Sequence, residues 1–121
     1  MDVAQIYSTA EEAARHWKSL SIQGRLTYFR SFQKVLADRA EDLSEILQQT
    51  TGKPAFEALT AEILTVLTTI SYWKREGARQ LLPVKTRTPL LFWGRRSWIE
   101  YHPMGVVLII APWNYPLQLT L

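Results

Sequence analysis

Hydrophobic positions in the first 80 residues recur every three or four places, which is typical of amphipathic helices. The apolar side of the opening helix is formed by Ile6, Ala10, Ala13 and Trp17. Ser21 can cap a second helix, whose apolar side is formed by Ile22, Leu26, Phe29 and Leu36. The pattern can restart at Asp38 and continues through Ala40, Leu43 and Leu47. Each predicted helix therefore has one face to bury.

Residues 51–54, Thr-Gly-Lys-Pro, predict the end of this helical run. Glycine can adopt the left-handed conformation that ends a helix, and proline can open the next one. The strongest periodic signal follows, with spacings of four, three, four and three residues between Leu59, Ile63, Val66, Ile70 and Trp73. This pattern predicts a long amphipathic helix after the break.

The pattern changes after Leu82, where Pro83, Pro89 and Gly94 mark a connector. Residues 97–102 alternate between apolar and polar and predict a half-buried strand. Residues 106–111 form an unbroken apolar run, which favours a strand buried on both faces of a parallel sheet. Parallel neighbours need connections of about a dozen residues or more. Ten residues follow Ala111, so we expect that this sheet is not completed within the chain.

The composition excludes several classes of protein. A hydrophobic fraction of 47% with 12% aromatic residues can form a core, which argues against intrinsic disorder. The absence of cysteine excludes a disulfide scaffold, a thiolate zinc site and a thiol nucleophile within these 121 residues. His16 and His102 lack a second ligand at metal spacing, so no metal site is expected. No secretory signal is visible, and we expect a soluble, cytoplasmic protein.

The net charge of +3 is unevenly distributed. Residues 74–100 carry seven basic and two acidic side chains, whereas residues 1–73 carry seven and nine. Three tryptophans (Trp73, Trp93 and Trp98) lie among the basic residues, so this segment could bind nucleic acid or anionic lipid. A solvated connector with stacking or packed tryptophans is the simpler interpretation. We therefore expect neither a nucleic-acid nor a membrane partner.

Candidate chemistry lies in the turn after the predicted buried strand, which is held by Pro112 and Pro116. In open α/β sheets, ligands bind beyond the carboxyl ends of the strands. Asn114 lies in this turn, and its neutral amide can donate two hydrogen bonds to a carbonyl oxygen that gains negative charge. Asparagine beside proline is also common as an ordinary turn residue. The local pattern by itself favours this second interpretation.

Residues 103–117 closely resemble the Pro-Gly-Val-Val…Pro-Trp-Asn-(Phe/Tyr)-Pro block of the NAD(P)-dependent aldehyde dehydrogenase superfamily. The Pro-Trp-Asn-Tyr-Pro form and the Arg-Thr-Pro sequence at residues 87–89 resemble its fatty- and aromatic-aldehyde (class 3-like) branch. The resemblance extends through the break at residues 51–54 and the strand near residue 100. Thr50 departs from the family pattern, since many relatives carry an acidic residue there. Relatives are several times longer, so the match covers only their N-terminal part.

The resemblance implies an α/β fold that is incomplete in this chain. A helical segment would span residues 1–82, followed by a connector and antiparallel strand over residues 83–102. Residues 103–121 would form the first buried strand and the Pro-Trp-Asn turn of a Rossmann-type nucleotide-binding domain. In this family a cysteine thiolate attacks the aldehyde, hydride passes to NAD or NADP, and a glutamate-activated water releases the carboxylic acid.

The resemblance also implies roles for individual residues. Asn114 would stabilise the oxyanion, and Ala111, Pro112 and Trp113 would line the cofactor cleft. The acidic side chains of Glu57, Glu62 and Glu100 are interpreted as parts of solvated helix or strand faces, and none is assigned as the general base.

Because the cysteine and a phosphate-binding glycine cluster are absent, we expect an N-terminal fragment that is inactive alone and binds NAD or NADP weakly. Its expected partners are a small-molecule aldehyde in the complete enzyme and a complementary fragment or further copies of itself. The alternative hypothesis is a standalone helical interaction module that docks through its apolar C-terminal strand.

Overall fold

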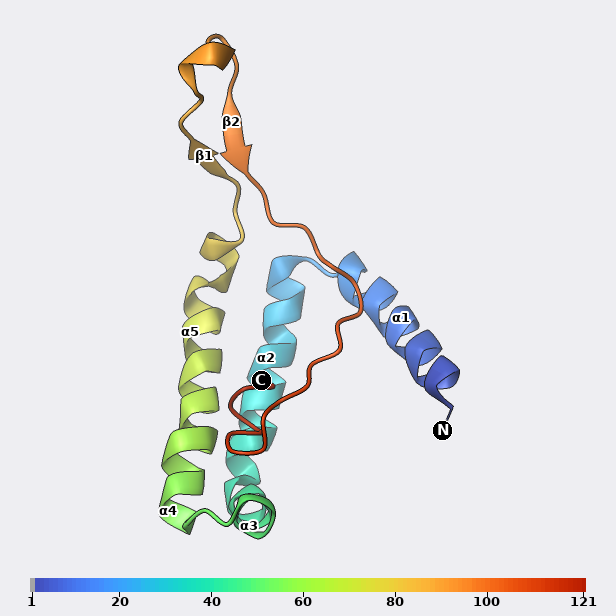
Figure 1. The fold of residues 1–121 in the computed structure, drawn as a ribbon, viewed down its shortest axis with the longest axis vertical. Coiled ribbons are helices and arrows are strands. Elements are labelled where there is room, and N and C mark those ends of the chain that lie inside the picture. Colours follow the sequence, from blue (N-terminus) through green and yellow to red (C-terminus); the bar gives the residue numbers. More distant parts are fainter. Residues whose placement is uncertain (1) are drawn as a thin grey trace.

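The computed structural model describes residues 2–121 as a helical body with a projecting hairpin (Figure 1). Met1, where the first predicted segment begins, lies outside the described residues. The helical elements are α1 (Val3–Ser19), α2 (Ile22–Asp38), α3 (Ala40–Thr51), α4 (Ala55–Glu57), the π-helix Ala58–Leu64 and α5 (Thr65–Gln80). The hairpin contains β1 (Val84–Thr86), a 3₁₀ turn (Leu90–Phe92) and β2 (Ser97–Ile99). None of the helices in residues 2–121 is long and apolar enough to cross a bilayer.

Two of the predicted helix boundaries are confirmed. The Ser21 hydroxyl accepts a hydrogen bond from the Gly24 backbone N–H at 3.1 Å and so caps α2. Gly52 ends α3 in the left-handed conformation, with a φ of 75°, and its N–H donates to the Gln48 carbonyl. The predicted restart at Asp38 is wrong. Asp38 is the last residue of α2, where it pairs with Lys34 one turn earlier, and the break falls at Arg39.

The core lies where α2 packs against α5 and α3 packs against the π-helix (Figure 1). Its two clusters of buried residues are Leu36, Val66 and Ile70, and Leu47, Ala58 and Ile63. Leu117, from the far end of the chain, packs against both clusters. The last turns of the chain are therefore docked on the helical core.

The π-helix and α5 together form the predicted long helix, and they bury only part of its apolar stripe of Leu59, Ile63, Val66, Ile70 and Trp73. Leu59 and Trp73, at its two ends, are 37% and 40% exposed. In a π-helix each hydrogen bond spans five residues, so the buried face rotates relative to that of an α-helix. The rotation places Ala58 and Glu62 on the buried side, where both are fully buried. The interpretation of Glu62 as a solvated side chain is therefore wrong.

The hairpin is short and antiparallel, with Val84 opposite Ile99 and Lys85 opposite Trp98. The strand predicted over residues 97–102 ends at Ile99, because β1 offers only three residues for pairing. Residues 106–111 run past α1 toward the last turns without regular structure, and residues 106–110 are exposed (Figure 1). No strand within residues 2–121 pairs with them. The buried strand at this position stays a prediction.

Candidate functional site

Asn114 lies in the turn that follows this apolar segment, and its side chain is exposed. The Asn114 amide makes no hydrogen bond to any of residues 2–121, so it does not play the usual part of a turn asparagine that bonds its own loop. The turns that follow are closed by other groups, including the Leu119 N–H, which donates to the Tyr115 carbonyl at 3.2 Å. Both donors of the Asn114 amide therefore remain available to a ligand.

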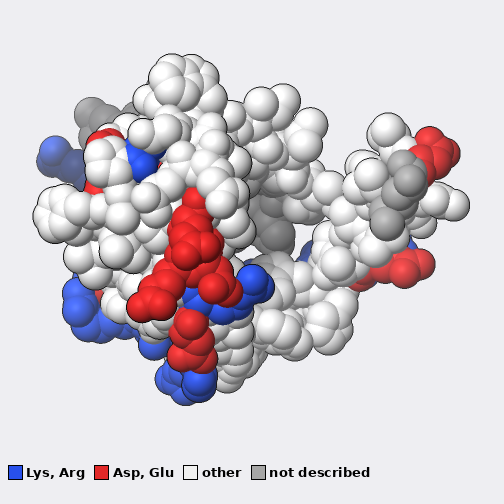
Figure 2. All heavy atoms as spheres, turned by 90° about the horizontal axis from the view of Figure 1, so that it is seen from below, with Lys and Arg blue, Asp and Glu red and all other residues white. Residues whose placement is uncertain are grey.

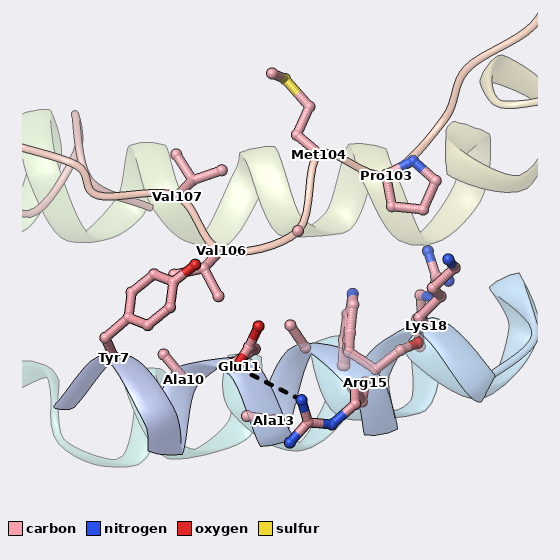
Figure 3. Close-up of a pocket in the computed structure, with 14 residues that line it drawn as sticks. Tyr7, Ala10, Glu11, Ala13, Arg15, Lys18, Pro103, Met104, Val106 and Val107 are labelled. Atoms are coloured by element: carbon pink, nitrogen blue, oxygen red, sulfur yellow. Dashed lines mark hydrogen bonds and ion pairs between the residues drawn. The ribbon is translucent and has the colours of Figure 1, made fainter. Parts of the chain in front are cut away.

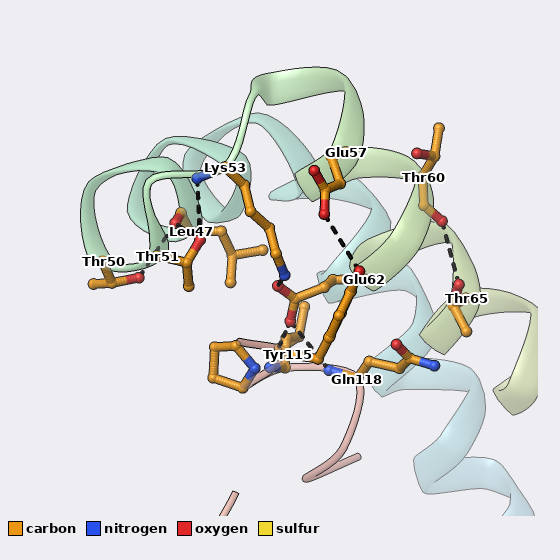
Figure 4. A network of polar contacts seen from close by, with 12 residues as sticks. Leu47, Thr50, Thr51, Lys53, Glu57, Thr60, Glu62, Thr65, Tyr115 and Gln118 are labelled. Carbon is orange, nitrogen blue, oxygen red and sulfur yellow. Dashed lines mark hydrogen bonds and ion pairs between the residues drawn. The ribbon is translucent and has the colours of Figure 1, made fainter. Parts of the chain in front are cut away.

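A buried ion pair holds the segment that follows Asn114. Glu62 is fully buried, the Lys53 side chain is only 9% exposed, and the two form an ion pair (Figure 4). The second carboxylate oxygen of Glu62 accepts hydrogen bonds from the backbone N–H groups of Leu117 at 2.8 Å and Gln118 at 3.4 Å. A buried charge is tolerated only when it is paired and hydrogen-bonded. The Glu62 carboxylate satisfies both conditions and joins three segments of the chain.

Tyr115, the neighbour of Asn114, is held from two sides. The Lys53 ammonium lies 3.7 Å from the centre of the Tyr115 ring, which is a cation–π contact. The Tyr115 hydroxyl donates to the Glu57 carboxylate at 3.3 Å. We call Lys53, Glu57, Glu62 and Tyr115 the anchor. The anchor fixes the residues directly after Asn114 against the start of the long helix.

Local structure explains how Lys53 reaches the anchor. The left-handed Gly52 turns the chain away from α3, and the Lys53 N–H donates to the Thr51 hydroxyl at 3.4 Å. The Thr51 hydroxyl in turn donates to the Leu47 carbonyl at 2.6 Å. Sequence reasoning missed the pairing of Lys53 with Glu62. The available signal was the position of Glu62, three residues after Leu59 and four before Val66, which places it on the same apolar face of the helix.

An apolar groove of about 470 Å³ runs between α3 and the last turns of the chain. Trp113 borders this groove together with Pro116 and Leu117. Of the other predicted cofactor-lining residues, Ala111 is half-buried and Pro112 is exposed. Of these three residues, which directly precede Asn114 in sequence, only Trp113 therefore borders the groove.

A second, larger groove of about 1090 Å³ separates α1 from residues 103–107. Figure 3 shows Val106 pointing toward α1 and Met104 pointing away from it. The Glu11 and Arg15 side chains at its edge form an ion pair with each other at 3.6 Å. This groove is therefore lined by both apolar and charged side chains. Within residues 2–121, no three side chains of the types that bind metals come together.

Comparison with known proteins decides the family. The sequence model of the "Aldehyde dehydrogenase family" matches residues 1–121. The chain belongs to the aldehyde dehydrogenase family. Its relatives include an aldehyde dehydrogenase-like protein of Schizosaccharomyces pombe, 32% identical over 97% of this chain, and a 4,4'-diapolycopene aldehyde oxidase of Methylomonas, 34% identical over 98%. A Mycolicibacterium smegmatis protein named as an NADP(+) succinate-semialdehyde dehydrogenase is 31% identical over 99% of this chain.

The chain spans about a fifth of these relatives, 22% of the first two and 23% of the third. It corresponds to an N-terminal portion of an aldehyde dehydrogenase. The helical body with a small two-stranded sheet is consistent with this portion of the family's domain. This stretch of the aldehyde dehydrogenase contains no cysteine. It therefore holds the Asn114 turn and its anchor but not a thiol nucleophile.

Proposed function

We propose that this chain supplies the oxyanion-stabilising turn of an enzyme that oxidises aldehydes to carboxylic acids with NAD or NADP. Asn114 is the residue in question, and the nucleophilic cysteine and the glutamate base come from elsewhere in the complete enzyme. The observation that carries the proposal is the state of the Asn114 amide, which is exposed, unbonded within residues 2–121 and followed directly by the buried anchor. Such a pre-positioned donor is what a developing oxyanion requires.

In the proposed reaction, the Asn114 amide stabilises the oxyanion and does nothing else. When a thiolate adds to the aldehyde, the carbonyl oxygen gains negative charge, and the amide N–H groups donate hydrogen bonds to it. Because the amide is neutral, its ability to donate does not change with pH. The anchor keeps the backbone after Asn114 from moving, so the donor needs little reorganisation during the reaction.

The nicotinamide cofactor would accept the hydride in this reaction. Ala111, Pro112 and Trp113 carry no charge, so they fit contact with an apolar face of NAD or NADP and not with its phosphates. A relative named for NADP(+) supports the use of such a cofactor. The five glycines of the chain are scattered and form no phosphate-binding cluster, so we expect these 121 residues alone to bind the cofactor weakly.

The proposal predicts that the chain alone does not reduce NAD or NADP with any aldehyde, whereas a chimera does. In the chimera, residues 1–121 replace the matching segment of the Mycolicibacterium smegmatis relative. Formation of reduced nicotinamide from succinate semialdehyde measures the activity, and the same chimera with Asn114→Ala is the control. Activity of the chain alone would contradict the proposal, as would a folded chimera that binds NADP but does not turn over.

A second candidate function is that of an interaction module. Residues 107–110, which are apolar, are exposed and unpaired with any strand in residues 2–121. A contiguous apolar surface of this kind favours association. We therefore predict that the chain self-associates in size-exclusion chromatography and that Leu108→Lys shifts it toward the monomer. Phe56→Lys, at a similarly exposed position on α4, should leave the elution unchanged. A single monomer peak from the unaltered chain would count against this function.

A further inference from the structure

Lys53 belongs to the Thr-Gly-Lys-Pro sequence, whose pattern by itself predicts only the end of a helix. The structure gives each residue of this sequence a part in placing the Lys53 side chain. The Thr51 hydroxyl accepts the Lys53 N–H at 3.4 Å, and the left-handed Gly52 turns the chain out of α3. Pro54 opens the next helical segment, since its carbonyl accepts the Ala58 N–H at 3.0 Å. The Lys53 side chain therefore points into the molecule, and only 9% of it is exposed.

The Lys53 ammonium is occupied on two sides. It forms an ion pair with the fully buried Glu62 carboxylate, and it lies 3.7 Å from the centre of the Tyr115 ring (Figure 4). An ammonium that is paired and covered in this way is not available to bind a substrate or a cofactor phosphate. We therefore look for its role in the segment that it contacts.

The two contacts of the ammonium hold both ends of residues 115–118, which directly follow Asn114. At one end, the ammonium contacts the Tyr115 ring. At the other end, its ion-pair partner Glu62 accepts the last two backbone N–H groups of this stretch, at 2.8 and 3.4 Å. The proline between the two ends has a fixed φ, so the stretch has little freedom to bend. Lys53 thus supports the backbone beside Asn114 through two separate contacts.

The Lys53–Glu62 pair differs from the ion pairs at the surface. Figure 2 shows the molecule from the end that carries α3 and α4, where acidic and basic side chains lie next to each other at the surface. Arg39 and Asp42 form a surface pair at 3.2 Å, with both side chains more than half exposed. Water screens such pairs, and they contribute little. A buried pair is screened much less and is costly to break, so it can fix a segment that a surface pair could not.

We propose that Lys53 is a positioning residue for aldehyde oxidation, because it fixes the backbone that presents the Asn114 amide. This inference rests on the proposed role of Asn114 and extends that role to a buried side chain. An oxyanion donor is most effective when its position is fixed before the charge develops. A misplacement of about 1 Å can cost roughly a hundredfold in rate. Loss of the Lys53 cation should therefore lower turnover although Asn114 itself is unchanged.

The first test removes the cation without leaving a buried charge. In Lys53→Met/Glu62→Gln, the glutamine oxygen can still accept the Leu117 N–H, but the cation that holds Tyr115 is gone. We expect this variant of the complete dehydrogenase to lose about tenfold or more in kcat, with KM little changed. Circular dichroism and a thermal melt establish that the variant keeps its fold. An unchanged kcat would overturn the inference.

A double-mutant cycle on kcat separates positioning from a general effect on the fold. A positioning residue acts through Asn114, so Lys53→Met/Glu62→Gln should cost nothing further in kcat when it is added to Asn114→Ala. Equal losses with and without the Asn114 amide would show that the anchor serves only the fold, and would overturn the inference while the proposed function stands. If Asn114→Ala by itself left kcat unchanged, the proposed function would fail as well, so the two failures are distinguishable.

Tyr115→Leu is a second test, which leaves the ion pair in place and removes only the ring that the cation holds. Tyr115→Phe is the matched control, because a phenyl ring also attracts a cation and only the hydroxyl bond to Glu57 is lost. We expect kcat of Tyr115→Leu to be about tenfold or more below that of Tyr115→Phe, and only when Asn114 is present. Equal kcat values for these two variants would contradict the inference, even if the variant without the Lys53 cation did not fold.

Discussion

We expect Asn114→Ala in the complete dehydrogenase to lower the turnover number by about a hundred- to a thousandfold, the usual effect of removing one oxyanion donor. In the proposed role, the amide would donate to an oxygen whose charge grows only as the thiolate adds, so the lost interaction would belong to the transition state. The loss should therefore appear in kcat and equally in kcat/KM, with KM little changed. Steady-state kinetics with a single aldehyde and saturating cofactor measure both parameters.

The matched control for this substitution is Gln118→Ala. Gln118 also carries an amide in the last turns of the chain, but its backbone N–H, and not its side chain, bonds to Glu62. Its replacement should leave kcat within a few-fold of the original value. If Asn114→Ala and Gln118→Ala had equally small effects, Asn114 would be only a turn residue and the proposed role would fail.

The sequence predicts the features that depend on neighbouring residues. The Ser21 cap needs one hydrogen bond to a residue three places on. The left-handed end of α3 needs only the conformational freedom of Gly52. Each is decided within a single helical turn, so pattern and residue type are sufficient to locate it.

The features that sequence reasoning missed depend on distant contacts or on an unusual helix. The burial of Glu62 requires the π-helix, which rotates the buried face, and backbone donors 55 residues away at Leu117. The exposure of Trp93 depends on the tip of the hairpin finding no helix to pack on in residues 2–121, although its composition resembles that of a core. For the same reason, the apolar run at residues 106–111 predicts a strand but not the neighbours that would pair with it.

The strongest effect on stability is expected at the anchor. Lys53→Met leaves the fully buried Glu62 carboxylate without its cation, and Glu62→Met leaves the Lys53 ammonium without its anion. Breaking one side of a buried ion pair typically costs about 3–5 kcal/mol. Each single substitution should therefore lower the free energy of unfolding of the chain by roughly this amount, measured by urea denaturation followed by circular dichroism.

The double variant Lys53→Met/Glu62→Met separates the charge effect from the loss of packing. With both charges removed, the remaining penalty is the unpaired backbone N–H groups of Leu117 and Gln118, so the double variant should be more stable than either single variant. Lys34→Met is the matched surface control, because its pair with Asp38 is close, at 2.6 Å, but exposed. Its cost should stay below about 1 kcal/mol. If Lys53→Met cost no more than Lys34→Met, the anchor would not hold the turn, and the pre-positioning of Asn114 would lose its structural basis.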